Sequence, residues 1–151
     1  MSADINKIAP TETTEEDYKE FVSRCRWWLR YLGLTGWDIG YRHVADLCDD
    51  HGDPCDACCQ PNIEGHIAVL SLSTRISESG QSVLSRLAFH EVCELFLADI
   101  DGLAKDRYCA EQAINVARHN IIRILENTLF TEKERGRQRA KTHTSKKEKT
   151  E

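Results

Sequence analysis

The sequence lacks several features that would place it in a particular class of protein. No apolar run approaches the roughly 20 residues that a membrane-spanning helix needs. The first residues, MSADINKIAPTETTEED, lack the basic and apolar regions of a signal peptide. Positive charge is not in excess, because the formal net charge is −5. We therefore expect a cytoplasmic protein without a membrane span. The chain as a whole does not look like a nucleic-acid binder.

A regular disulfide pattern is also missing. The 7 cysteines are an odd number and no secretory signal accompanies them, so we expect reduced thiols. Several cysteines gather in the stretch CDDHGDPCDACC, which contains a C-x-x-C and one histidine. The candidate ligands of a structural zinc ion there are Cys48, His51, Cys55, Cys58 and Cys59. Only half of a paired C-x-x-C framework is present, and Cys58 and Cys59 would face opposite sides of a strand. A second metal at this cluster is therefore the less favoured interpretation.

Internal repeats are absent, and 151 residues with 40% hydrophobic content suggest one domain with tails. We expect a disordered N-terminus over residues 1–13, a domain over 14–130 and a disordered polar, mostly basic tail over 131–151. The tail could add weak, salt-sensitive contacts to phosphates and no more.

Hydrophobic periodicity predicts an α+β fold with three main helices and three strands. A helix should begin after Thr13 or Thr14 and end at Gly33, which suits the residue after a helix C-cap. The remaining expected elements are strands at 37–44, 57–61 and 66–73, a helix at 82–100 that ends at the Asp-Gly pair 101–102, and a helix at 105–130. The strands are expected to form a small antiparallel meander on which the central helix packs.

The central helix, LAFHEVCELFLAD, is apolar on most sides and yet contains His90, Glu91 and Glu94. At about 100° per residue these three share an arc of about 100°. One apolar face of the helix is formed by Leu84, Ala88, Val92 and Leu95. Bare ionised groups in such a helix would cost several kcal/mol, unless they are paired or bind a cation. His90 and Glu94 are four residues apart and can chelate one metal ion, and Glu91 lies beside them. The alternative is a buried hydrogen-bond cluster held by an arginine such as Arg42 or Arg75.

At this point the sequence resembles a known family. The text HEVCE is the H-E-x-x-H helix of zinc proteases with glutamate in place of the second histidine. Together with WWLRYLGLTGWDIGYR, HIAVLSLS and IIRILENTLF, it resembles the short zincin-like metallopeptidases of phages and prophages, which are distantly similar to SprT-type proteins. The resemblance covers about residues 18–130.

The resemblance implies that His90 is a zinc ligand, Glu91 the general base and Glu94 the replacement for the second histidine. A third ligand would come from the last helix, where the register falls on or beside His119. Glu111 is the reserve candidate, because it lies at the edge of the apolar stripe of that helix. His119 could instead pair with Asn115 or Glu126 on its own helix.

The function implied by the resemblance is zinc-dependent hydrolysis of a peptide or protein substrate. An edge strand, expected to be 66–73, would bind the extended substrate near the metal. The rival hypothesis is an inactive fold of the same kind that binds a protein partner, with or without a structural metal. A monomer or a small homo-oligomer fits either hypothesis.

Overall fold

The computed structural model describes residues 10–49, 51–106, 108 and 110–132. The described chain mixes helices and strands, which confirms the predicted α+β class. It forms two compact units, one that ends at Gly102 and one that begins at Leu103. The expected single domain over residues 14–130 stays a prediction. The elements are β1 (Thr11–Glu12), α1 (Glu15–Tyr31), β2 (Asp38–Val44), β3 (Ala57–Asn62), β4 (Ile67–Ser73), β5 (Arg75–Ile76), α2 (Gln81–Lys105), α3 (Glu111–Leu125) and the π-helical η1 (Glu126–Phe130).

Helix α1 begins and ends where local chemistry dictates. The Thr14 side chain accepts a hydrogen bond from the Asp17 backbone, and the Asp17 carboxylate accepts one from the Thr14 backbone, which together form a capping box. The Thr14 backbone and the Thr14 hydroxyl both donate to the Asp17 carboxylate, and these two hydrogen bonds hold the pKa of Asp17 below its ordinary value. At the other end Gly33 has φ of +68°, the left-handed conformation that glycine adopts without steric cost.

The three-stranded sheet is not the predicted meander. Its order is β2–β4–β3, so β4 lies in the middle. β2 pairs with β4 in parallel, and β3 pairs with β4 antiparallel. The expectation that residues 66–73 form an edge strand was therefore wrong, because β2 and β3 are the two edges. A parallel pair needs a crossover rather than a tight turn, and the stretch from Ala45 to His66, which includes β3, provides it.

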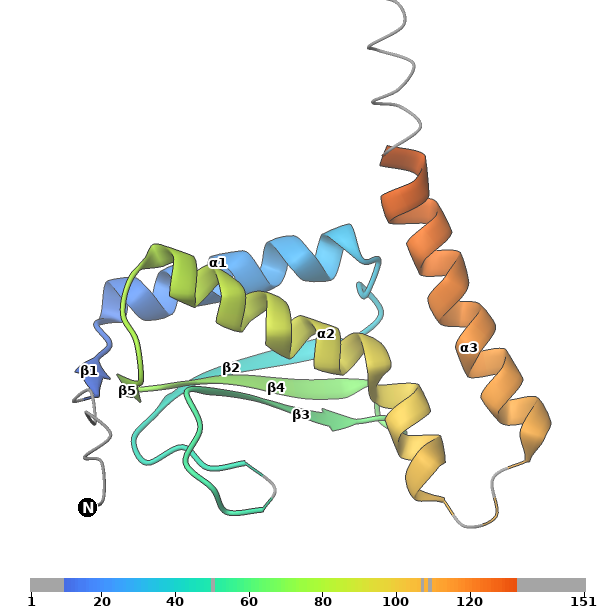
Figure 1. Ribbon diagram of the computed structural model, residues 1–151, viewed down its shortest axis with the longest axis horizontal. Helices are drawn as coiled ribbons and strands as arrows, with labels where there is room; N and C mark the ends of the chain where they lie inside the picture. The colour runs from blue at the N-terminus through green and yellow to red at the C-terminus, as the bar shows by residue number, and fades with distance from the viewer. Residues whose placement is uncertain (1–9, 50, 107, 109, 133–151) are drawn as a thin grey trace, which may run out of the picture. The chain divides into compact units, whose positions relative to one another are not determined.

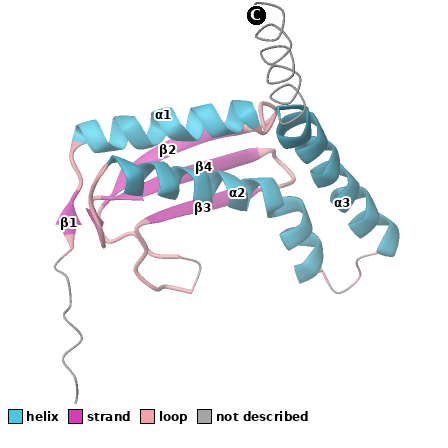
Figure 2. Cartoon of the chain, turned by 45° about the horizontal axis from the view of Figure 1, so that its top comes forward, coloured by secondary structure: helices cyan, strands magenta, loops and turns pink. Residues whose placement is uncertain are grey.

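The helices α1 and α2 lie on one face of this sheet (Figures 1 and 2). Side chains of β4 alternate accordingly. Ala68, Leu70 and Leu72 face the helices and are buried. From α1, Phe21 and Cys25 complete this core and are fully buried. The packing of the central helix on the sheet, which the sequence predicted, is therefore present.

Helix α2 continues past the Asp-Gly pair that was expected to end it, and its last residue is Lys105. Gly102 lies inside the helix, where a Cβ atom would be 2.5 Å from Cδ1 of Ile63. Glycine is therefore used here for close approach to the turn between β3 and β4, rather than as a helix stop.

Residues before the expected boundary at residue 14 take part in the fold. β1 pairs antiparallel with β5, and the Thr13 backbone donates to the Thr74 carbonyl at 2.9 Å. The Thr13 hydroxyl donates to the Ser73 carbonyl at 2.8 Å. Residues 1–9, and residues 133–151 of the expected tail, lie outside the described residues.

In the second unit, α3 begins at Glu111 rather than at the expected residue 105, and η1 follows without a break. Thr128 donates to the Ile124 carbonyl at 2.7 Å within this stretch. No helix in the described part of the chain is long and apolar enough to cross a bilayer.

Replacing Gly33 by alanine tests the left-handed end of α1. The variant should lose about 1 kcal/mol of unfolding free energy, because an L-residue is strained at positive φ. Gly36→Ala is the matched control, since an added Cβ would have no atom within 4 Å at either position and only Gly33 has a positive φ. Urea denaturation measures both. Equal midpoints for the two variants would contradict the assigned role of Gly33.

Candidate functional site

Of the three ionisable residues in the motif HEVCE, only Glu91 is buried. Its residue is 3% exposed, whereas the side chains of His90 and Glu94 are 67% and 52% exposed. The core side of α2 is occupied by Leu84, Ala88, Val92 and Leu95, as its periodicity predicted. The expectation that all three polar residues lie in a buried helix was therefore wrong for two of them. His90 and Glu94 lie at the rim of the core, where ionised groups stay hydrated.

His90 and Glu94 are in contact on this rim. The His90 Nε2 atom lies 3.2 Å from Oε1 of Glu94, as expected for two side chains one helical turn apart. An imidazole nitrogen and a carboxylate oxygen at this spacing are two ligand types that zinc accepts. They are also an ordinary ion pair when the histidine is protonated.

The Glu91 carboxylate reaches the edge of the sheet and accepts a hydrogen bond from the Cys59 backbone. The pairing of β3 explains why this N–H is available. Ser73 donates to the Asp56 carbonyl at 2.8 Å, so every second residue from Asp56 bonds to β4. The backbone hydrogen-bonding groups of Ala57, Cys59 and Pro61 consequently point away from β4. Glu91 takes the Cys59 donor, and Pro61 has none to offer.

Burial raises the pKa of Glu91 from its ordinary value of 4.5 to about 8. The largest cause is desolvation, which disfavours the charged form. The negative charge of Glu94 raises it further, and the hydrogen bond from Cys59 opposes these effects only in part. A carboxyl group with this pKa exchanges its proton near neutral pH, which is the behaviour required of a general acid–base residue.

Two thiols surround the same carboxyl group. Cys25 comes from α1 and Cys59 from β3, and both interact electrostatically with Glu91. Burial raises the pKa of Cys59 to about 12 and that of Cys25 higher still, so both thiols are neutral at pH 7. No local sequence pattern could show that Cys25 and Cys59 interact with the same carboxyl group.

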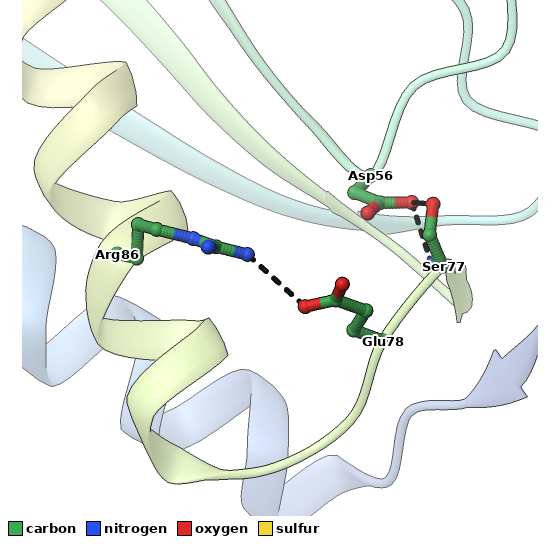
Figure 3. A network of polar contacts seen from close by, with 4 residues as sticks. All are labelled: Asp56, Ser77, Glu78 and Arg86. Atoms are coloured by element: carbon green, nitrogen blue, oxygen red, sulfur yellow. Dashed lines mark hydrogen bonds and ion pairs between the residues drawn. The ribbon is translucent and has the colours of Figure 1, made fainter.

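A hollow of about 370 Å³ opens beside the motif. His90 and Glu91 line it from α2, and Ala57 lines it from the first residue of β3. Figure 3 shows the polar contacts at its margin: Arg86 pairs with Glu78 at 3.2 Å, and Asp56 accepts hydrogen bonds from the backbone and hydroxyl of Ser77 at 2.9 and 3.0 Å. The motif residues and the start of an edge strand thus share one depression.

The arginines considered as partners of the cluster lie elsewhere. Arg75 forms its ion pair with Glu12, at 4.0 Å. Arg42 of β2 pairs with Ser71 of β4, and both side chains lie on the face of the sheet away from the helices. No ion pair of the described residues joins a guanidinium to Glu91 or Glu94.

The candidate third ligands belong to the second unit. Glu111 is the exposed first residue of α3. His119 is exposed, and its Nδ1 donates to the Asn115 carbonyl at 2.8 Å, which is the local pairing considered from sequence. This hydrogen bond leaves Nε2 as the ring atom with a lone pair, an arrangement common in metal-binding histidines. The role of either residue as a ligand stays a prediction.

The cysteine-rich segment before β3 forms a turn. The Asp49 carboxylate accepts hydrogen bonds from the backbones of His51 and Asp53, both at 2.9 Å, and Cys48 bridges to Pro54. Cys58 and Cys59 are consecutive in β3 and pair with Ser71 and Leu70, so their side chains face opposite sides of the sheet. Within the described ranges no three histidine, cysteine or acidic residues are grouped as they would be around a metal ion.

No protein-family model, curated protein or solved structure matches this chain.

The raised pKa of Glu91 predicts a pH-dependent stability in the metal-free protein. Between pH 4.5 and about 8 the folded state keeps a proton that the unfolded state has lost. Unfolding free energy should therefore fall as pH rises through this window, by at most about 1.4 kcal/mol per pH unit, and level off above it. Glu91→Gln removes this contribution.

Denaturation of wild type and Glu91→Gln in a chelator, at several pH values, measures the difference. The exposed Glu64→Gln serves as a control for loss of one carboxylate. A constant difference between wild type and Glu91→Gln from pH 5 to 9 would contradict a protonated Glu91.

Proposed function

We propose that the chain is a zinc-dependent peptidase of the cytoplasm. The observation that carries the proposal is the buried Glu91, with its pKa raised to about 8, which lines a hollow at the sheet edge together with His90. His90 in turn contacts Glu94. This combination of an acid–base carboxyl, two ligand types and a cavity is what metal-assisted hydrolysis requires.

The residues fit a metal in part. His90 Nε2 and Glu94 Oε1 would hold the ion from α2, and His119 would supply the third ligand, with Glu111 in reserve. When bound, zinc would polarise the substrate carbonyl and lower the pKa of a water molecule. The set keeps two imidazoles and one carboxylate, with His119 in the role of the second histidine.

Glu91 would move the proton. It lies beside His90 in sequence, lines the same hollow and is fixed by the Cys59 backbone. As general base it would take a proton from the attacking water, and as general acid it would pass that proton to the leaving amine. The surrounding neutral thiols of Cys25 and Cys59 keep its environment poorly hydrated, which strengthens its interactions with charge.

The peptide substrate would lie along β3 rather than β4. β3 is the edge strand beside α2, and its residue Ala57 lines the hollow together with Glu91. Because Glu91 takes the Cys59 donor and Pro61 has no N–H, strand addition is limited to the neighbourhood of Ala57. The substrate would therefore form few backbone hydrogen bonds before the scissile bond reaches Glu91.

The second candidate is an inactive fold that binds a protein partner. It is favoured by Glu94 itself, because a carboxylate in place of a neutral imidazole makes a bound metal less electrophilic. It is also favoured by the hydrogen bond between Glu91 and β3, which a purely structural carboxyl would make as well.

Metal content tests the ligand set. Purified wild type should contain near one equivalent of zinc by elemental analysis, and His90→Ala and Glu94→Ala should lose it. Loss in His119→Ala with retention in Glu111→Ala would identify the third ligand, and the reverse result would select Glu111. His66→Ala is the control for removal of an exposed histidine that belongs to neither candidate metal site. Absence of metal in zinc-replete wild type would contradict the site.

Peptidase activity tests the role of Glu91. Glu91→Gln should retain zinc and lose activity by about 10²- to 10⁴-fold, the usual contribution of a general base. Hydrolysis of a fluorogenic peptide library by the zinc-loaded protein measures this. Activity that survives in Glu91→Gln would exclude Glu91 as the base, and zinc-loaded wild type without activity would favour the partner-binding candidate.

A further inference from the structure

The second edge of the sheet is β2, and it differs from β3 because no proline and no side chain of the described residues occupies its outward backbone groups. Asp38 donates to the His66 carbonyl at 2.8 Å and Thr74 donates to the Val44 carbonyl at 2.9 Å. In a parallel pair this pattern means that the backbone N–H and C=O groups of the even-numbered residues of β2 point toward β4. The backbone groups of Ile39, Tyr41 and His43 consequently point outward.

These outward groups form an available strand edge. Among the described residues, none of the backbone hydrogen bonds outside helices and strands engages Ile39, Tyr41 or His43. The edge contains no proline, and a seven-residue edge strand without such protection is a template for a further strand. On β3, by contrast, Pro61 and Glu91 occupy the corresponding positions.

A basic hollow lies directly beside this edge. It measures about 530 Å³ and is lined by Lys19, Arg26 and Arg30 of α1 and by the rings of Tyr18 and Tyr41. None of the described residues that line it is a carboxylate. Glu15 acts on Tyr18 electrostatically at the N-terminal end of α1. The chain as a whole has a net charge of −5, whereas this hollow is positively charged because three cations line it.

The contacts between α1 and β2 place the cations along the edge. Tyr18 stacks on His43 with ring centroids 5.0 Å apart, and the Arg26 guanidinium lies 5.3 Å from the centre of the Tyr41 ring. α1 therefore runs antiparallel to β2. Arg26 and Arg30 are separated by about 6 Å along the helix axis, close to the roughly 7 Å between alternate residues of a strand.

We propose that β2 and the basic hollow bind an extended acidic segment of a protein partner, which adds to the sheet as a fourth strand. Backbone hydrogen bonds to Ile39 and Tyr41 would fix the segment, and alternate side chains would point to the same side as Tyr41. Carboxylates at those alternate positions would meet Arg26 and Arg30 in turn. Backbone pairing supplies affinity in this mode of recognition, and the side-chain contacts supply specificity. This surface is independent of the peptidase proposal.

The experiment uses a labelled peptide, Thr-Glu-Val-Glu-Val-Glu-Thr, and the full chain in a chelator, with fluorescence anisotropy as the readout. Arg30→Gln should weaken binding about fivefold, the upper range for one exposed charge pair. Arg24→Gln is the matched control, because Arg24 is on the same helix but pairs with Glu20 at 2.7 Å and does not line the hollow. It should leave binding unchanged.

Peptide variants separate strand addition from simple charge attraction. N-methylation of the glutamates, whose N–H groups would face β2, should abolish binding, whereas N-methylation of the valines should not. Hydrogen exchange should slow at the amides of Ile39 and Tyr41 when the peptide is added. Equal effects of the two methylation patterns, or protection of Ala57–Asn62 instead of β2, would overturn the proposal. So would tighter binding of a single-stranded oligonucleotide of equal charge that also depends on Arg30.

Discussion

The hydrogen bond between the Cys59 backbone and the Glu91 carboxyl is the interaction on which the arrangement of the candidate site depends. It joins α2 to the edge of β3, and the buried thiols of Cys25 and Cys59 interact electrostatically with the same carboxyl group. Burial costs less when the group is protonated, and the raised pKa shows that the fold keeps the proton instead of hydrating the charge. The same bond removes one donor from the edge strand. One side chain therefore joins the helix to the sheet edge and occupies one of the donors of that edge.

The sequence predicted those features that depend on local pattern. Helical spacing identified the buried side of α2 through Leu84, Ala88 and Val92, and glycine chemistry identified the end of α1 at Gly33. Strand order was not predictable in this way, because alternation is the same in a parallel and an antiparallel strand. β4 is central because β2 pairs with it directly, although β3 lies between these two strands in the sequence. The continuation of α2 through Gly102 depends on a contact with Ile63, which no local signal reports.

The candidate site was predicted only where it depends on the spacing of residues along one helix. The spacing of His90 and Glu94 placed them on one side of a helix, and the structure shows them in contact. Their exposure was not foreseen, because periodicity gives the direction of a side chain but not the extent of the neighbouring elements. The surroundings of Glu91 come from α1 and β3, which are far apart in the sequence. A pKa near 8 is thus a property of the assembled core, whereas the motif itself contains only the carboxyl group.

The net charge of the chain and the charge around β2 lead to different conclusions about the binding of acidic partners. A total of −5 argues against binding of acidic partners, yet α1 directs Lys19, Arg26 and Arg30 into one hollow beside β2. Because charges farther apart than about 8–10 Å are largely screened at physiological salt, a nearby acidic segment responds to these cations and not to the total. The two sheet edges therefore differ in chemistry as well as in access. At β3 a carboxyl group and a proline occupy the edge, and at β2 the edge is open and its surroundings are cationic. If a peptide substrate binds at β3 and a protein partner at β2, as proposed, this difference would give each edge its own selectivity.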